Sequence, residues 1–180
     1  MPGSAFLRGD RVVLRTVEED DLAFLRDNVD DPRVRRPLTG TEPTNMETTR
    51  EHFEEYISAE EDLTLALCVD GDIRGTITLF GVDQRAGTAE VAYWLTPEAH
   101  GRGLMTEAAR LLVGYAFEEL RLRRVRGRAL ATNEASKGVL RNCGMQREAV
   151  GREAGTVDGE YVDMIHFGVL REEWEGADDP

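Results

Sequence analysis

Two glycines and an arginine stand between a strand-like run and a helix-like run near the middle of the chain. The strand-like run is Glu90-Val91-Ala92-Tyr93-Trp94-Leu95, the loop contains Gly101-Arg102-Gly103, and apolar residues then recur at helical spacing from Leu104 to Leu120. Glycines allow consecutive backbone N–H groups to converge, and the start of a helix adds unpaired donors and the positive end of its dipole. The pattern predicts an anion site, with a phosphate or pyrophosphate as its natural ligand.

The spacing of these glycines excludes two common phosphate-binding motifs. A P-loop requires G-x-x-x-x-G-K-[ST], and this loop contains no lysine. A dinucleotide fingerprint requires a third small residue, which is missing from the Leu104-Met105-Thr106 segment. A tight strand-to-helix connection without a ligand is the alternative interpretation.

The residues around the loop resemble the acyl-CoA loop of the GNAT N-acetyltransferases, whose pattern is [QR]-x-x-G-x-[GA] after a bulged strand. The stretch from Asn133 to Met145 resembles the N-x-x-S…G-[FM] segment of the branch that acetylates ribosomal-protein N-termini (RimJ/RimL-like). The opening from Gly9 to Arg15 and the late strand from Glu160 to Met164 resemble that branch as well. The resemblance therefore covers nearly the whole chain in order.

The resemblance implies that acetyl-CoA binds at the glycine loop, without a metal. The loop would hold the pyrophosphate, the edge of the preceding strand would bind pantetheine as an added strand, and Asn133 would hold pantetheine farther along. His100 stands where Gln or Arg is usual and Met105 where Gly or Ala is usual, so these two positions bear on cofactor affinity. The cofactor-binding residues that we expect are Trp94, Leu95, Thr96, His100, Gly101, Arg102, Gly103, Leu104, Met105, Thr106, Asn133 and Ser136.

Several of these residues also have an ordinary structural interpretation. Trp94 lies in an alternating strand whose buried face the sequence leaves open, so it could be a core residue. Asn133 and Ser136 suit the start of a helix, where polar side chains cap backbone groups. Cys143 could carry an acyl group, but the three histidines are scattered, and we interpret it as a packed thiol.

Glu90 is our candidate for the general base. It is a carboxylate in a strand of otherwise apolar or small residues, where it could accept a proton from an amine. An exposed strand face is the alternative, and Asp163 in the last strand allows the same two interpretations. By resemblance, Ser136 lies near the sulfur, where it would donate a proton or a hydrogen bond to the departing thiolate.

Two groups of arginines call for interpretation. Arg124, Arg126 and Arg128 alternate along one strand, which favours a solvated face paired with nearby acids over a nucleic-acid surface. The loop 33–43 holds three more arginines, which could select an acidic group in the substrate or simply be solvated.

The remaining pattern predicts one mixed α/β (α+β) domain over residues 1–180. Turns at Asp70-Gly71 and Asp158-Gly159 indicate two hairpins, and two capping boxes, Thr16-x-x-Glu19 and Thr44-x-x-Glu47, indicate helix starts. The expected order is β-α-α-β-β-β-α-β-α-β-β, with a mostly antiparallel central sheet of about seven strands flanked by helices, and an acidic tail, 172–180, that frays. The expected strands are 11–15, 63–69, 73–80, 88–95, 124–130, 145–150 and 161–170.

The composition narrows the class of protein. The net charge is −13 and Lys137 is the one lysine among 22 basic residues, which argues against nonspecific nucleic-acid binding and suits a halophile with molar internal salt. A genome rich in G and C is the alternative cause of the arginine preference. The two distant cysteines suit a reducing cytosol. The first eleven residues lack a signal pattern and no apolar run reaches membrane-span length, so we expect a cytoplasmic protein.

These observations predict an acetyl-CoA-dependent N-acetyltransferase that acts by direct attack of a primary amine in a ternary complex. The acceptor implied by the resemblance is a protein N-terminus, such as that of a ribosomal protein. The alternatives are an enzyme that acetylates a small-molecule amine, a non-catalytic CoA-binding sensor, and a nucleotide-binding module. The sequence does not decide between a monomer and a homodimer.

Overall fold

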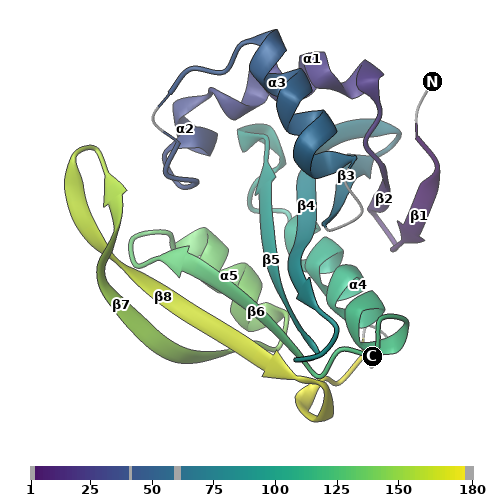
Figure 1. Ribbon diagram of the computed structural model, residues 1–180, viewed down its shortest axis with the longest axis vertical. Coiled ribbons are helices and arrows are strands. Elements are labelled where there is room, and N and C mark those ends of the chain that lie inside the picture. Colours follow the sequence, from purple (N-terminus) through teal and green to yellow (C-terminus); the bar gives the residue numbers. More distant parts are fainter. Residues whose placement is uncertain (1–2, 41, 59–61, 177–180) are drawn as a thin grey trace.

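The computed structural model describes residues 3–40, 42–58 and 62–176. Its centre is a sheet of eight strands in the order β1-β2-β3-β4-β5-β6-β8-β7, shown in Figure 1. Neighbouring strands are antiparallel except β5 and β6, which are parallel. The strands are β1 (Ala5–Arg8), β2 (Val13–Thr16), β3 (Leu63–Val69), β4 (Asp72–Asp83), β5 (Thr88–Leu95), β6 (Arg124–Leu130), β7 (Gln146–Val157) and β8 (Glu160–Leu170).

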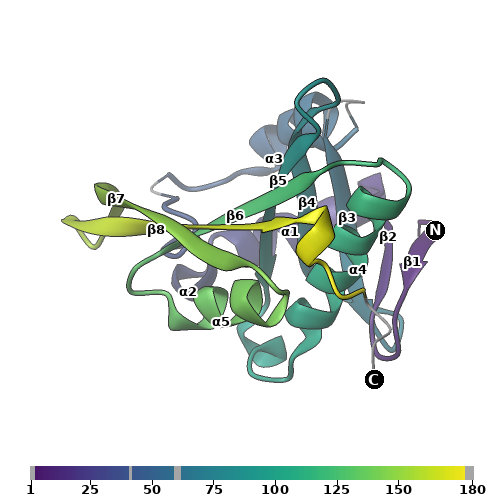
Figure 2. The same cartoon turned by 90° about the horizontal axis from the view of Figure 1, so that it is seen from below.

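Helices cover both faces of this sheet, as Figure 2 shows for α4 and α5 on one side and α3 on the other. The longest is α4, which connects the two parallel strands and packs with α5 against the larger core. A smaller core lies under α1 and α3. The helices are α1 (Leu22–Val29), α2 (Pro32–Arg35), α3 (Met46–His52, continued by a π-helical turn, Phe53–Ile57), α4 (Leu104–Glu118) and α5 (Glu134–Asn142). None of them combines the length and the apolar character that a membrane span requires.

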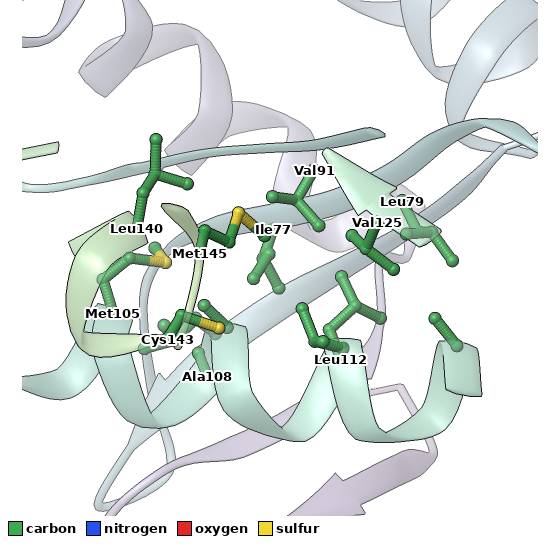
Figure 3. Close-up of a cluster of buried hydrophobic side chains, with 14 of the residues drawn as sticks. Ile77, Leu79, Val91, Met105, Ala108, Leu112, Val125, Leu140, Cys143 and Met145 are labelled. Atoms are coloured by element: carbon green, nitrogen blue, oxygen red, sulfur yellow. The ribbon is translucent and has the colours of Figure 1, made fainter. Parts of the chain in front are cut away.

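The larger core is a layer of aliphatic and sulfur-containing side chains between the sheet and α4 (Figure 3). Leu112 of α4 and Val125 of β6 are fully buried there, and Cys143 lies in the same layer after α5. The alternation of β6, with Val125 and Ala129 buried and the arginines between them facing outward, is the period-two pattern of a strand with one covered face.

The smaller core contains a buried ion pair. Arg15 on β2 donates two hydrogen bonds of 2.7 Å to the carboxylate of Asp21, and both side chains are about one-tenth exposed. Burial by itself raises the pKa of Asp21, but the hydrogen bonds from Arg15 and from the backbone N–H of Glu18 outweigh it and hold that pKa below its usual range. The pair joins β2 to the turn that leads into α1.

Strands β5 and β6 pair along only part of their length. Thr88–Val91 pairs with Arg124–Gly127, and the two strands then diverge, β5 staying with β4 and β6 with β8. This opening between parallel strands is visible in Figure 1. Gly127 stands at the point of divergence, where a Cβ atom would lie 2.6 Å from Leu140 Cδ2, so α5 packs directly on the strand backbone.

The structure corrects several local predictions. The sheet has eight strands rather than about seven, because Ala5–Arg8 adds a short edge strand to β2. The segment predicted as a loop after Pro32 contains α2. The helix starts are displaced: the Thr16 hydroxyl bonds Glu18, and Asn45 rather than Thr44 caps α3 by accepting from the backbone of Thr48.

The acidic tail is ordered in its first part, where fraying was expected. Residues Arg171–Glu173 form a 3₁₀ turn, and Trp174 packs against Phe117 with ring centroids 5.9 Å apart. The Arg110 guanidinium lies 5.5 Å from the centre of the Trp174 ring. The part of the prediction that concerns residues 177–180 lies outside the described residues.

Candidate active site

The opening between β5 and β6 is the centre of a cavity of about 760 Å³. The glycine loop and the first residues of α4 form one part of its lining, and α5 begins at another. The α2 segment and the β7–β8 hairpin complete the walls. Nine of the twelve residues predicted to bind cofactor, together with Glu90, line this cavity; the nine are Trp94, Leu95, His100, Gly101, Gly103, Leu104, Met105, Asn133 and Ser136.

Both glycines of the loop adopt left-handed backbone conformations. Gly101 and Gly103 have φ values of 71° and 73°, in the left-handed region that favours glycine, and Gly103 directly precedes α4. A Cβ atom at Gly101 would meet nothing within 4 Å. The loop therefore leaves space beside the N-terminus of α4, where unpaired N–H groups favour an anion.

Arg11 secures this loop from the other end of the chain. Its guanidinium donates a 2.8 Å hydrogen bond to the carbonyl of Arg102 and a 2.9 Å bond to the carboxylate of Glu107, and its backbone N–H donates to the same carboxylate. Burial raises the pKa of Glu107, but the hydrogen bonds from Arg11 and from the backbone of Val12 outweigh it, so that pKa is lowered. No local pattern indicates this clamp, since the partners are more than ninety residues apart in the sequence.

The two departures from the family pattern have different structural roles. His100 Nε2 lies 3.1 Å from the carbonyl oxygen of Leu95, so the ring bridges the end of β5 and the loop. Met105 is only 5% exposed and lies in the core beside Leu140 and Cys143 (Figure 3). Its side chain packs between α4 and α5 rather than filling the space over the loop.

Three residues predicted to bind cofactor do not line the cavity. Arg102 is exposed and contributes its carbonyl to the Arg11 clamp, and Thr106 is half-buried in the first turn of α4. Thr96 is buried, and its Oγ1 makes no hydrogen bond within the described part of the chain. An unpartnered buried hydroxyl beside the end of β5 is compatible with a polar ligand at that strand edge.

Tyr93 and Trp94 lie on opposite faces of β5. The alternation of the sequence had left open which face of this strand is buried. Trp94 stacks on Phe24 of α1, with ring centroids 6.0 Å apart, at the smaller core. Tyr93 turns toward the larger core, and its hydroxyl lies 3.0 Å from Ser136 Oγ and 3.2 Å from the Ser136 carbonyl oxygen. Sequence reasoning missed Tyr93 as a site residue.

The start of α5 is built by Asn133. Its side-chain oxygen accepts a 3.1 Å hydrogen bond from the backbone N–H of Ser136, so the capping interpretation is confirmed. The cap engages only the amide oxygen, and Asn133 also lines the cavity, where its amide N–H groups are suited to a ligand carbonyl. Both structural and binding interpretations of this residue are therefore compatible with its position.

Glu90 is the one carboxylate among the described residues that line the cavity. Its side chain is 18% exposed, and Oε1 forms an ion pair with Nε of Arg128 on β6 at 3.1 Å. Asp163, the other candidate base, instead accepts a hydrogen bond from the backbone of Glu153 at a bulge in β7 and is absent from the lining.

The arginines of β6 have acidic partners. Arg128 pairs with Glu90, and Arg124 lies 2.5 Å from Glu148 on β7. The interpretation of a solvated face paired with acids is therefore confirmed at these two positions. Cys143 is fully buried, and burial raises its pKa to about 12, which fits a packed thiol.

The far end of the cavity is closed by α2 and the β7–β8 hairpin. Arg33 on α2 pairs with Asp31 at 2.7 Å and reaches Glu98 near the glycine loop at 3.7 Å. Arg36 pairs with Asp158 in the hairpin turn at 3.2 Å. The contacts of Arg33 with Glu98 and of Arg36 with Asp158 connect α2 to the segment before the glycine loop and to the hairpin turn.

A mixed sheet with a divergent parallel pair, a glycine loop at a helix start and a cavity between them define an acyl-CoA-dependent transferase. The model of the acetyltransferase (GNAT) domain matches residues 11–146, and the chain belongs to this family. The resemblance read from the sequence is thereby confirmed, and the protein is an N-acetyltransferase.

Known proteins resemble this chain in sequence or in fold. YdaF of Bacillus subtilis (strain 168), provisionally named a ribosomal N-acetyltransferase, is 40% identical over 110 residues, which cover 61% of this chain and 60% of YdaF. A spermidine N-acetyltransferase from Vibrio cholerae, solved with CoA and spermine, has a TM-score of 0.84 at 18% identity and covers 92% of this chain and 98% of its own. RimL, a ribosomal L7/L12 α-N-protein acetyltransferase solved with CoA, has a TM-score of 0.81 at 19% identity, with 90% and 95% covered.

Proposed function

We propose that the protein transfers the acetyl group of acetyl-CoA to the α-amino group of a protein or peptide N-terminus. The observation that carries the proposal is the single cavity in which the glycine loop, the open edge of β5, Ser136 and Glu90 meet. A donor and an acceptor that approach from opposite ends of this cavity would react directly in a ternary complex. The resemblance to the RimJ/RimL-like branch and the name of YdaF support a protein acceptor.

The residues of the loop fit the phosphates of CoA. Gly101 and Gly103 open the backbone, the start of α4 supplies N–H donors, and Arg11 lies close enough to add positive charge, its Nη2 being 3.5 Å from a Cβ placed at Gly103. The edge of β5 beyond Val91 supplies backbone groups for the pantetheine amides. In this arrangement Asn133 would hold the pantetheine and Ser136 would lie at the sulfur.

Glu90 is the proposed general base. An α-ammonium group has a pKa of about 8, so a modest base suffices to free the amine. The amine nitrogen attacks the thioester carbonyl, backbone N–H groups stabilise the oxyanion, and the C–S bond breaks with its electron pair on sulfur. The proton leaves through Glu90, directly or by a water, and Ser136 donates a hydrogen bond to the thiolate.

The charges of the cavity favour a peptide over a polyamine. Its described lining contains two arginines, Arg33 and Arg128, against the one carboxylate of Glu90. A polyamine has several positive charges and requires carboxylates to replace its hydration, whereas a peptide N-terminus has one ammonium and several carbonyl groups that arginines can bind.

The test is Glu90→Gln assayed with free N-terminal peptides, including those of ribosomal proteins. We expect kcat to fall by about 10²- to 10⁴-fold, the usual contribution of a general base, with little change in KM for acetyl-CoA. Glu148→Gln is the matched control, because it removes the carboxylate of another glutamate–arginine pair on this sheet that lies outside the cavity lining. Full activity of Glu90→Gln with an unchanged pH profile would assign Glu90 a structural role.

Acetylation of a small-molecule amine is the second candidate function. The ion pair of Arg36 with Asp158 joins α2 to the hairpin turn beside the cavity, an arrangement that would favour a small substrate, and the spermidine acetyltransferase has the same fold. Mass spectrometry after incubation with peptides, amino acids, aminoglycosides and spermidine separates the candidates. Acetylation confined to small amines would replace the proposed acceptor, and CoA binding without turnover on any amine would indicate a sensor.

A further inference from the structure

The hydroxyl of Tyr93 on β5 contacts Ser136 on α5 across the opening between β5 and β6. Tyr93 lies two residues beyond Val91, the last residue of β5 that pairs with β6. From there its ring lines the cavity and its hydroxyl reaches Ser136, forty-three residues farther along the chain. Neither the capping of α5 nor the packing of the core requires a hydroxyl at this point, since a phenylalanine would fill the same space.

The contacts hold Ser136 at three atoms. Its backbone N–H donates to Asn133, its carbonyl oxygen lies 3.2 Å from the Tyr93 hydroxyl, and its Oγ lies 3.0 Å from the same hydroxyl. The Ser136 side chain is thus fixed relative to β5, the strand that carries Glu90. A residue that presents its hydroxyl to a departing sulfur benefits from such fixing, because no rotamer search is needed during the reaction.

The single phenol proton of Tyr93 cannot form a full hydrogen bond with the carbonyl oxygen and with Oγ of Ser136 at the same time. When Tyr93 donates to the Ser136 carbonyl, the Ser136 hydroxyl is free to donate to the phenol oxygen. When Tyr93 donates to Ser136 Oγ, the Ser136 proton is free for a third group. Both arrangements fit the same heavy-atom positions, and they differ only in rotation about two C–O bonds.

We propose that Tyr93 is a positioning residue that orients the Ser136 hydroxyl and directs its proton toward the departing sulfur of CoA. This role rests on the proposed function, in which Ser136 lies at the sulfur during acetyl transfer. As the new N–C bond forms and the C–S bond breaks, the electron pair passes to sulfur and the amine proton to Glu90. Ser136 donates a hydrogen bond to the thiolate while Tyr93 donates one to Ser136 Oγ. Neither hydroxyl loses its proton.

The acid–base properties of the groups agree with hydrogen bonding rather than proton transfer. Burial raises the pKa of Tyr93 above its usual value, and the hydrogen bond with Ser136 opposes this only in part. A thiol has a pKa of about 8.5, well below that of a buried phenol. The thiolate would therefore leave without taking a proton from the tyrosine, which stays a neutral donor throughout.

The experiment is a double-mutant cycle of Tyr93→Phe and Ser136→Ala. We expect each single substitution to lower kcat by roughly tenfold, about 1.4 kcal/mol, with KM for acetyl-CoA changed less than twofold for Tyr93→Phe. Because Tyr93 acts through Ser136, the double variant should match Ser136→Ala rather than lose about a hundredfold. Thiol release is followed with whichever amine the wild type accepts, so a wrong acceptor leaves this test intact.

The matched control is Tyr115→Phe. This tyrosine lies on α4, also has its pKa raised by burial, and packs edge-on against Phe6 away from the cavity. It should keep full kcat, and circular dichroism should show all variants folded. Wild-type kcat in Tyr93→Phe, multiplicative losses in the cycle, or wild-type kcat in Ser136→Ala would each overturn the role of Tyr93. The last result would also remove Ser136 from the proposed mechanism, whereas the first two would leave it in place.

Discussion

Placing a carboxylate in the glycine loop tests the anion site directly. In Gly103→Asp, the new Cβ would meet nothing closer than Arg11 Nη2 at 3.5 Å, so the substitution is not excluded by space. Its cost to folding comes from the φ of 73°, which an L-residue adopts at about 1–2 kcal/mol. We expect the variant to fold with slightly reduced stability.

The effect on CoA binding should be larger. A unit negative charge about 6 Å from a phosphate costs roughly 3 kcal/mol at an effective dielectric constant of about 20. The loop is exposed, and Arg11 can pair with the new carboxylate, so solvent and this arginine reduce the penalty. We therefore expect a loss of about 1–3 kcal/mol, or roughly 5- to 150-fold in Kd.

Two control variants separate charge from backbone strain. Gly103→Ala has the same φ without the charge and should bind CoA within a few-fold of wild type. Gly71→Asp adds the same carboxylate at a φ of 88° in the β3–β4 turn, where a Cβ meets nothing within 4 Å, and should lose stability only. Calorimetric titration with CoA measures all four proteins. Wild-type affinity in a folded Gly103→Asp variant would refute the placement of the pyrophosphate.

Three further predictions concern stability. The pKa values of Asp21 and Glu107 are lowered in the folded state, so their contribution to the free energy of unfolding is complete above a pH of about 5 and is lost as pH falls through the lower folded values. An unfolding midpoint that is unchanged between pH 5 and pH 3 would contradict this. Gly127→Ala should lower the free energy of unfolding by about 1–3 kcal/mol, because the new methyl group would clash with α5. Gly138→Ala, on an open helix face, should raise it by up to about 1 kcal/mol. Urea unfolding measures both variants. If the protein comes from a halophile, the midpoint temperature of thermal unfolding should rise from low to molar KCl. A midpoint that does not change with KCl concentration would refute that origin.

Local signals predicted the elements that define the site. The strands 63–69, 88–95 and 124–130 have the predicted ends, and α5 begins where Asn133 and Ser136 indicated a helix start. Alternation, the Asp70-Gly71 turn and the polar start of α5 are local features of these elements. The left-handed φ values of Gly101 and Gly103 were predictable for the same reason: few other residues adopt that conformation without strain. The divergence of β5 and β6, in contrast, is contained in no local pattern.

The contacts that complete the site could not be predicted in this way. Arg11 and Arg102 are ninety-one residues apart, Tyr93 and Ser136 forty-three, and Glu90 and Arg128 come from strands separated by α4. Each contact depends on how distant elements pack, and periodicity does not encode it. The two predicted capping boxes were wrong even though their residues are close in the sequence, because Thr16 and Thr44 use their polar groups in other contacts.

Several of these long-range contacts converge on β5 and α4, the two elements that flank the glycine loop. Arg11 fixes the start of α4 through Glu107, His100 fixes the end of β5, and Tyr93 ties β5 to α5. The loop itself is exposed and contributes little packing, so its conformation depends on these neighbours. A preorganised anion site requires this arrangement, because donors that are already in place need no reorganisation when the cofactor binds. The residues that shape the site therefore extend well beyond those that would touch CoA.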